Sequence, residues 1–385
     1  MRQFWLVVFL AVPAGASSVT PEMDKLVLEG IDALYRMDFA AADKAAEKAM
    51  ALQPDFPHPY LGAAATELIR FTYGAEASDP SQLKHFEAKV DKAAQVAERW
   101  LKTHPRDADA LMVLGSAHGI SSRLALVRRD WLDAFSHGRK AMKSVRAAQK
   151  ADPELWDAYL GTGMFDYYVD TIPRFAGWLA KVMLGGDRAR GLKQIKIAAE
   201  KGHYAKTAAQ LILVEVYTED NFGGRNPPEA VRLMTGIRAK YPDSPMIHSA
   251  HVVSLYEDKR YAEAARESEE YLRRVATGRY AAMNKPKGHA LLGTVLWAAG
   301  DKEKALAEFR AGAAPVPGAL RTRWAVWSRV RAGQVLDALG RRADAVAEYR
   351  AAFAERKLWD FKGVLKPCLA KPCLDGLPGH FSPPY

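Results

Sequence analysis

Cysteine is nearly absent from this chain of 385 residues, which contains only Cys368 and Cys373. Two thiols at this spacing, with no histidine motif nearby, make a poor zinc or haem site, and the lack of a C-x-x-C pair argues against redox catalysis. In an oxidising compartment they can instead close a short loop. We therefore predict a Cys368–Cys373 disulfide, with free thiols as the alternative, and no metal site.

Apolar runs long enough to cross a membrane are also missing. One short run, Phe4–Val12, follows Arg2 and precedes the letters AGASS, an order typical of a secretory signal peptide cleaved after about Ala16. An uncleaved anchor is disfavoured because spanning a bilayer takes about 20 apolar residues. We expect residues 1–16 to be a signal peptide and the mature chain to be exported, periplasmic or otherwise associated with the cell envelope.

Common catalytic and nucleotide-binding signatures are lacking as well: no G-x-x-x-x-G-K-[ST] loop, G-x-S-x-G elbow or H-E-x-x-H pair occurs. The segment GGDRARG follows no predicted strand, so we interpret Asp187 as a helix N-cap and not as part of a phosphate loop. His248 and His251 lie three residues apart on a predicted helix without an identifiable third ligand, and we interpret them as packed or surface residues. These patterns predict a non-catalytic protein without a cofactor.

Two similar segments near the C-terminus carry the clearest pattern that is present. They read LLGTVLWAAGDKEKALAEFRAG and RAGQVLDALGRRADAVAEYRAA. In each, the first glycine (Gly293 or Gly333) is followed by an alanine at +12 and by an aromatic residue at +16 (Phe309 or Tyr349). Small residues at fixed helical positions let two helices pack closely, so the pattern predicts repeated helix–turn–helix units.

This spacing resembles that of the tetratricopeptide repeat (TPR). The resemblance implies an all-α fold, a right-handed superhelical solenoid of antiparallel helix pairs whose concave groove holds a peptide or a partner helix. Leu-Gly pairs and closing prolines recur along the chain and divide residues 17–365 into about seven to eight helix pairs, clearest at 286–357. The predicted pairs span about 22–53, 57–104, 107–152, 154–202, 203–241, 244–279, 286–317 and 322–357. Residues 366–385, rich in Pro and Gly, are expected to form an irregular tail.

An apolar segment at 172–184 interrupts the repeats and contains Phe175 and Trp178. We interpret it first as a capping helix that fills the groove of the solenoid. The alternative is a membrane or lipid contact, because a short amphipathic segment of this kind can lie on an anionic surface.

Positive charge is concentrated at the C-terminal end of the chain. Residues 271–385 contain 20 Lys and Arg against 9 Asp and Glu, a net +11, whereas the whole chain carries +10. Trp297, Trp324, Trp327 and Trp359 lie among these cations. The simplest interpretation is a solvated basic face over tryptophans in the core. The alternative is an electropositive groove for an acidic protein, an anionic lipid or an envelope polymer. Nucleic acid is not expected as a partner of an exported chain.

The TPR resemblance also nominates residues of the concave groove, which the first helix of each pair lines. The inward positions correspond to Asp109, Met112, Ser116, Lys287, Thr294, Trp297, Trp327, Gln334 and Asp337. Each is alternatively a buried contact between repeats, Trp297 above all. Together the patterns predict an exported bacterial TPR-like scaffold that binds a protein partner in the cell envelope. A carrier or tether for anionic lipid or envelope polymer is the alternative.

Overall fold

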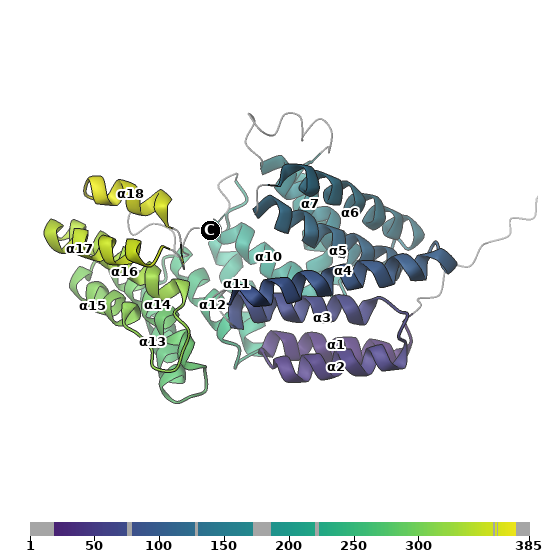
Figure 1. Ribbon diagram of the computed structural model, residues 1–385, viewed down its shortest axis with the longest axis horizontal. Helices are drawn as coiled ribbons and strands as arrows, with labels where there is room; N and C mark the ends of the chain where they lie inside the picture. The colour runs from purple at the N-terminus through teal and green to yellow at the C-terminus, as the bar shows by residue number, and fades with distance from the viewer. Residues whose placement is uncertain are drawn as a thin grey trace, which may run out of the picture. The chain divides into compact units, whose positions relative to one another are not determined.

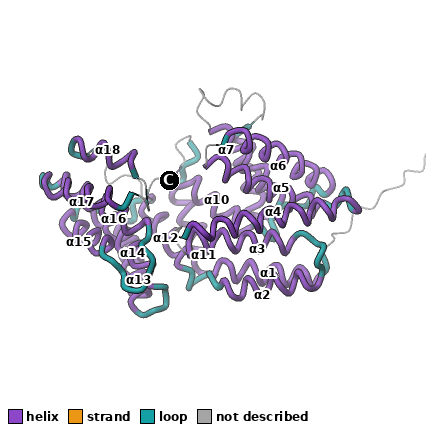
Figure 2. Tube along the Cα trace, viewed as in Figure 1, coloured by secondary structure: helices purple, strands orange, loops and turns teal. Residues whose placement is uncertain are grey.

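A computed structural model of the chain describes residues 19–74, 79–127, 130–171, 186–219, 223–356, 359 and 361–374. Within these ranges every regular element is a helix and no strand is present, which confirms the predicted all-α fold (Figure 2). The predicted signal peptide at 1–16 and the apolar segment at 172–184, with Phe175 and Trp178, lie outside the described residues. Both therefore stay predictions.

In chain order the described α-helices form eight consecutive pairs followed by one terminal helix (Figure 1). The pairs are α1 (Pro21–Arg36) and α2 (Phe39–Leu52), α3 (His58–Ile69) and α4 (Pro80–Thr103), α5 (Ala108–Val127) and α6 (Trp131–Ala151), α7 (Ala158–Thr171) and α9 (Arg188–Lys201), α10 (Lys206–Glu219) and α11 (Pro227–Lys240), α12 (Pro245–Glu257) and α13 (Tyr261–Ala276), α14 (Lys285–Ala298) and α15 (Lys302–Ala313), and α16 (Arg323–Ala338) and α17 (Arg342–Ala354). The terminal helix is α18 (Lys362–Ala370). A π-helical turn, η1 (Arg70–Gly74), extends α3, and a 3₁₀ turn, η2 (Ala282–Asn284), precedes α14.

The chain divides into two compact units. Unit 1 contains the residues up to Leu28, Ala45–Gly62 and Lys89–Lys206. Unit 2 contains Glu29–Lys44, Ala63–Ala88 and the residues from Thr207 onward.

Sharp turns between the two helices of a pair depend on residues with positive φ. Gly300 (φ 96°) follows α14 and Gly340 (φ 76°) follows α16, each seven residues after the glycine of the sequence repeat. Glycine adopts this conformation without a steric penalty, and so short a turn makes the following helix run antiparallel to the first. The equivalent turns after α1 and α12 place Met37 (φ 61°) and Lys259 (φ 60°) in the same region.

Helix starts are fixed by side-chain caps that satisfy the exposed N–H groups of the first turn. Asp187 accepts a 2.9 Å hydrogen bond from the backbone N–H of Arg190, which confirms the predicted N-cap of α9. Ser244 caps α12 in the same way, and Pro245 occupies the first helical position, where its missing N–H costs nothing. Asp301 caps α15 through the N–H of Lys304.

The glycine-to-aromatic spacing of the sequence has a direct counterpart in the packing of unit 2. A Cβ added at Gly293 would lie 2.9 Å from the ring of Phe309, and one added at Gly333 would lie 2.5 Å from the ring of Tyr349. Both aromatic side chains are completely buried. The two glycines therefore leave room for an aromatic ring of the second helix to pack against the backbone of the first helix.

In unit 1 two glycines bring helices α7 and α9 into backbone contact. A Cβ added at Gly191 would lie 2.5 Å from the backbone nitrogen of Tyr167, and one at Gly163 would lie 2.9 Å from the carbonyl oxygen of Gly191. Any larger residue at either position would force the two helices apart. The close approach of α7 and α9 therefore depends on Gly163 and Gly191.

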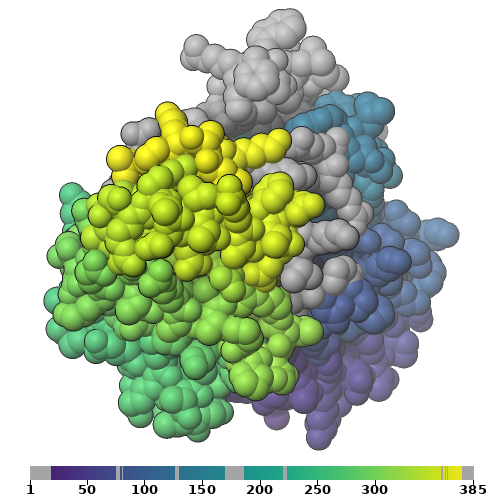
Figure 3. Space-filling model, turned by 60° about the vertical axis from the view of Figure 1, so that its left-hand side comes forward, coloured from purple at the N-terminus to yellow at the C-terminus, as the bar shows by residue number. Residues whose placement is uncertain are grey.

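The C-terminal end of the described chain is more regular than the sequence suggests. Helix α18 continues to Ala370, so the first residues of the predicted irregular tail are helical despite Pro367. Leu365 and Cys368 are fully buried in the core shared with α16 and α17, and this burial outweighs the helix-breaking effect of proline. Cys368 and Cys373 are joined as a disulfide, with Cα atoms 5.0 Å apart. In the space-filling view α18 lies directly on the side chains of the preceding helices (Figure 3).

Candidate binding face on helices α14 and α16

Eight of the nine residues that the repeat register places in a concave groove are buried. In unit 1, Asp109 and Met112 on α5 are buried and Ser116 is half-buried. In unit 2 all six are buried, three on α14 and three on α16: Lys287, Thr294, Trp297, Trp327, Gln334 and Asp337. The structure does not test their predicted contact with a partner, but it shows which of them lie together.

Lys287 on α14 is the first of two buried cations on helices α14 and α16. Its Nζ atom lies 5.5 Å from the ring centroid of Trp324 and 5.7 Å from that of Tyr73. Only 4% of Lys287 is exposed, whereas Trp324 is half-buried and Tyr73 is 39% exposed. The ammonium group is therefore packed between two aromatic rings whose outer edges reach the surface, an arrangement that favours cations through the ring quadrupoles.

Tyr73 reaches this position because of the π-helical turn η1. Arg70 holds the turn through ion pairs with Asp43 and with Glu67, the latter at 2.7 Å, and its guanidinium lies 5.3 Å from the ring of Phe39. Gly74 closes the turn against the same phenylalanine, where a Cβ would come within 2.9 Å of the ring. Single π-helical turns occur often at functional sites, because they redirect one side chain out of the helical register.

Arg331 on α16 is the second cation. Its guanidinium carbon lies 4.6 Å from the ring centroid of Trp297 and 5.9 Å from that of Trp327, and its Nη1 donates a 3.0 Å hydrogen bond to Oε1 of Gln334. Arg331 is only 2% exposed, and burial lowers the pKa of its guanidinium to about 10, so it remains charged at neutral pH. A charge this deeply buried needs electron-rich neighbours, and the rings and the amide supply them.

We call the six residues that carry these contacts the cation–aromatic face: Tyr73, Lys287, Trp297, Trp324, Trp327 and Arg331. All of them belong to unit 2. The indole N–H of Trp327 is buried and has no hydrogen-bond acceptor among the described residues.

The repeat register found three members of this face, Lys287, Trp297 and Trp327. It missed Tyr73, which lies outside the repeat in sequence and depends on a π-helical turn. It also missed Trp324 and Arg331, although both belong to the basic, tryptophan-rich segment noted in the sequence. Trp324 and Arg331 are seven residues apart in α16 and therefore lie on one helix face. This spacing could have identified them from the sequence.

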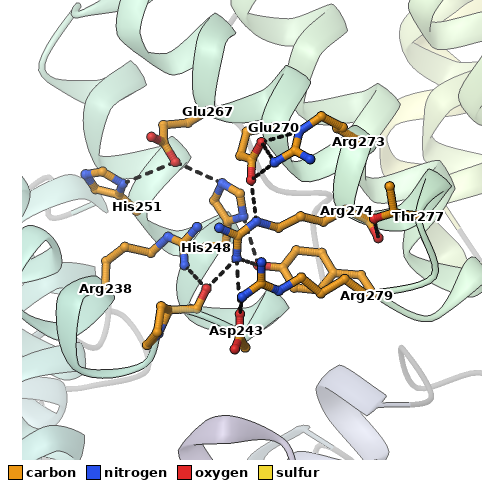
Figure 4. A network of polar contacts seen from close by, with 12 residues as sticks. Arg238, Asp243, His248, His251, Glu267, Glu270, Arg273, Arg274, Thr277 and Arg279 are labelled. Carbon is orange, nitrogen blue, oxygen red and sulfur yellow. Dashed lines mark hydrogen bonds and ion pairs between the residues drawn. The ribbon is translucent and has the colours of Figure 1, made fainter.

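A polar network on the neighbouring helices α11–α13 holds the end of α13 that leads into α14 (Figure 4). Arg238 and Arg274 both donate to the backbone carbonyl of Pro242, the latter at 2.5 Å, and Arg279 forms an ion pair with Asp243. These contacts join the turn between α11 and α12 to the end of α13. The arginines are thus engaged in supporting the fold on which the cation–aromatic face is built.

His248 lies at the centre of the same network and is completely buried. Arg274 donates to the hydroxyl of Tyr280 at 3.1 Å, and that hydroxyl lies 3.0 Å from Nδ1 of His248. The hydroxyl proton is then directed at Nδ1, which leaves the ring proton on Nε2, 2.9 Å from Glu267. The contact with His248 lowers the pKa of Glu267 to about 2, whereas burial lowers the pKa of His248 itself. A neutral histidine facing an ionised glutamate is therefore the expected state at neutral pH.

His251, the second histidine noted in the sequence, lies 4.0 Å from Glu267 and adds no metal site. In the part of the chain that the structure describes, no group of three or more His, Cys, Asp or Glu residues is placed to hold a metal ion. Nor does any helix in that part have the length and apolar character needed to cross a membrane.

Consecutive helix pairs, two of which place a glycine of the first helix against an aromatic ring of the second, define a TPR-like helical-repeat protein. No model of a known protein family matches the sequence, and no curated protein matches it. Among solved structures, the chain is similar to a tetratricopeptide repeat protein from Parabacteroides merdae, with 12% identity and a TM-score of 0.36 over 91% of this chain and 98% of that one.

Two further solved structures are similar over most of their length. Human IFIT1, solved as a dimer with m7Gppp-AAAA, gives 12% identity and a TM-score of 0.47 over 92% of this chain and 86% of that one. Yeast Tom70 gives 11% identity and a TM-score of 0.40 over 88% and 85%. At these identities and scores the similarities carry no argument about what this chain binds.

Proposed function

We propose that this chain is a non-catalytic scaffold that binds a protein partner through the cation–aromatic face of α14 and α16. The observation that carries the proposal is the packing of two cations, Lys287 and Arg331, against tryptophans on the first helices of successive pairs. Cations held between aromatic rings favour a partner segment that offers carboxylates.

The aromatic edges give this face a way to be reached from outside. Tyr73 and Trp324 are partly exposed, and each flanks the Lys287 ammonium. Tyrosine and tryptophan are the residue types that most often dominate binding energy at protein interfaces. An acidic segment lying across these two rings would bring its carboxylate to Lys287 while its apolar atoms cover the rings.

We also propose that the mature protein works outside the cytoplasm, in the periplasm or at the cell envelope. The leader-like sequence at 1–16 supports this, and so does the Cys368–Cys373 disulfide, because disulfides persist mainly in oxidising compartments. The alternative function, a carrier or tether for anionic lipid or envelope polymer, rests on the segment 172–184, which lies outside the described residues.

The test is an affinity pull-down from native envelope extract with the mature protein as bait, at low and moderate salt. The captured protein is identified, and its binding is then measured with purified components. Lys287→Met, which keeps the aliphatic stem but removes the charge, and Trp324→Ala should each weaken that binding at least tenfold. Leu52→Ala, at an exposed apolar position of α2, is the matched control and should leave binding unchanged.

Thermal melting of each variant shows that the fold is intact before binding is compared. Equal binding by Lys287→Met, Trp324→Ala and the unmodified chain would contradict the proposed face. Lipid or polymer that co-purifies in the absence of any stoichiometric protein would contradict the scaffold and favour the alternative function.

A further inference from the structure

Helix α6 in unit 1 carries a stripe of exposed cations that no part of the proposed function uses. Arg139, Lys143, Arg146 and Lys150 are all exposed and lie 7, 11, 14 and 18 residues after the exposed Leu132. Steps of three and four residues keep side chains on one helix face. At 1.5 Å per residue the stripe is about 27 Å long. We call these four residues and Leu132 the α6 stripe.

The cations of the α6 stripe are not balanced by acidic neighbours. None of the four forms an ion pair with any carboxylate in the part of the chain that the structure describes. The one acidic residue within α6, the exposed Asp133, lies one position after Leu132 and therefore about 100° around the helix from it. The stripe is thus uniformly positive along its whole length.

Some exposed arginines elsewhere in the chain pair with a nearby glutamate. Arg232 pairs with Glu229 at 2.6 Å, and Arg260 pairs with Glu263 at 2.5 Å. On α13, Arg273 pairs with Glu270 at 2.6 Å. Such pairs at i and i±3 are the ordinary composition of a solvated helix surface. On α6, by contrast, four cations without such a pair lie in line on one helix face.

One end of the α6 stripe is apolar and unusually exposed. Leu132, in line with the cations, is 84% exposed, and Trp131, about 100° around the helix on the side opposite Asp133, is 65% exposed. Phe135, one turn further along, is half-buried and carries the guanidinium of Arg139 at 5.8 Å from its ring. Tryptophan next to leucine and basic residues is the combination found where helices lie at a membrane interface.

We propose that the α6 stripe docks this protein on the surface of an anionic lipid bilayer. The cations would lie over the lipid phosphates, while Trp131 and Leu132 insert at the level of the headgroups. A nucleic acid or an acidic protein would satisfy the charges but would leave the two apolar side chains exposed. The inference stands on α6 alone and does not depend on the cation–aromatic face in unit 2.

The test is vesicle co-sedimentation of the mature protein with liposomes of phosphatidylglycerol and phosphatidylcholine at a ratio of about 3:7, and with phosphatidylcholine alone. Each cation near an anionic surface contributes about fivefold to partitioning, so reversing two of them with Arg139→Glu and Lys143→Glu should lower binding to the anionic vesicles by at least tenfold. Trp131→Ser with Leu132→Ser should lower it several-fold at unchanged salt dependence. Binding should fall steeply between about 0.1 M and 0.5 M salt.

The matched control reverses two exposed cations on α4, Lys92→Glu and Lys102→Glu, which give the same change in net charge in the same unit. The control should bind the vesicles as the unmodified chain does. Circular dichroism melting checks that all variants are folded, and Arg139→Gln with Lys143→Gln serves as a milder second pair. Equal losses in the α6 and α4 pairs would overturn the proposal, and so would equal binding to phosphatidylcholine alone. Binding to DNA or to an acidic polymer that exceeds vesicle binding, and is lost in the α6 pair, would overturn it in favour of a polymer.

Discussion

The hydroxyl of Tyr349 on α17 donates a 2.8 Å hydrogen bond to the carboxylate of Asp337 on α16. The same carboxylate accepts from Arg342 at 3.0 Å and from the backbone N–H of Cys373 at 2.9 Å. Asp337 therefore ties α16 to α17 and to the disulfide turn that follows α18. The repeat register places this residue in the groove, and its contact with a partner stays a prediction. Its contacts within the chain already give it a structural role.

Asp337→Ala is expected to lower the free energy of unfolding by about 3 kcal/mol or more, because it leaves the partly buried Arg342 and the buried Tyr349 hydroxyl without their acceptor. Tyr349→Phe removes a single hydrogen bond and should cost about 1 kcal/mol. Urea denaturation followed by circular dichroism measures both. The exposed Asp344→Ala on α17 is the control, expected within about 0.5 kcal/mol of the unmodified chain. A cost for Asp337→Ala no larger than that of the control would contradict the role assigned to it.

Gly333→Ala is expected to destabilise the chain by about 1–3 kcal/mol, because its Cβ would lie 2.5 Å from the ring of the fully buried Tyr349. Gly236→Ala lies in the exposed middle of α11, where no atom comes within 4 Å of the added Cβ. There the same substitution should stabilise by about 0.5–1 kcal/mol through helix propensity. Thermal melting of the two variants should therefore move in opposite directions. A stabilising Gly333→Ala would show that the close ring packing is not real.

Lys259→Gly is expected to raise the stability of the chain by about 1 kcal/mol. Lys259 holds φ 60° in the turn between α12 and α13, a conformation that costs an L-residue with a side chain about 1–2 kcal/mol. Glycine occupies the corresponding turn after α16, and Gly340→Ala should lower stability for the same reason. The difference in melting temperature between these two variants is the measurement. Destabilisation by Lys259→Gly would mean that the lysine side chain contributes more than its backbone strain costs.

Stability should fall as the pH is lowered from about 6.5 towards 4, in part because of His58 in unit 1. This residue is buried beside Phe56 and Tyr204, and neither ring nitrogen has a hydrogen-bond partner among the described residues. Burial lowers its pKa to about 4, against a partial opposing effect of Asp157. Since the unfolded chain binds this proton near pH 6.5 and the folded chain does not, acidification favours unfolding, by up to roughly 3 kcal/mol.

The comparison for His58 uses urea denaturation at pH 7.5 and pH 5 with His58→Phe and with His85→Gln, the latter at an exposed position. Other buried groups also contribute to the pH dependence, so the difference between variants is the informative quantity. His58→Phe should lose part of the drop in stability between the two pH values, whereas His85→Gln should retain all of it. The same pH dependence in both variants would exclude a contribution from His58.

The C-terminal pairs were predictable because one glycine and one aromatic residue at fixed spacing produce a single close contact, as Gly293 and Phe309 show. The position of Tyr73 was not predictable, since it depends on a π-helical turn that Arg70 holds by pairing with Glu67 and with Asp43, which is 27 residues away in sequence. The net charge of long segments likewise did not reveal the α6 stripe. Arg139, Lys143, Arg146 and Lys150 form a stripe only when they are placed on a helix, where steps of three and four residues share one face. The helical part of the expected tail follows from burial of Cys368, which local composition does not reveal.

A partner bound to the cation–aromatic face would lie next to Tyr73. The most direct test replaces Tyr73 with photo-reactive benzoylphenylalanine and irradiates the protein in native envelope extract. A second protein carries the same group at Leu52, which is 43% exposed and belongs to unit 1. A discrete protein adduct is expected at position 73, lost in Lys287→Met and absent at position 52. Adducts of equal yield at both positions, or an adduct at 73 that Lys287→Met leaves unchanged, would contradict binding at this face.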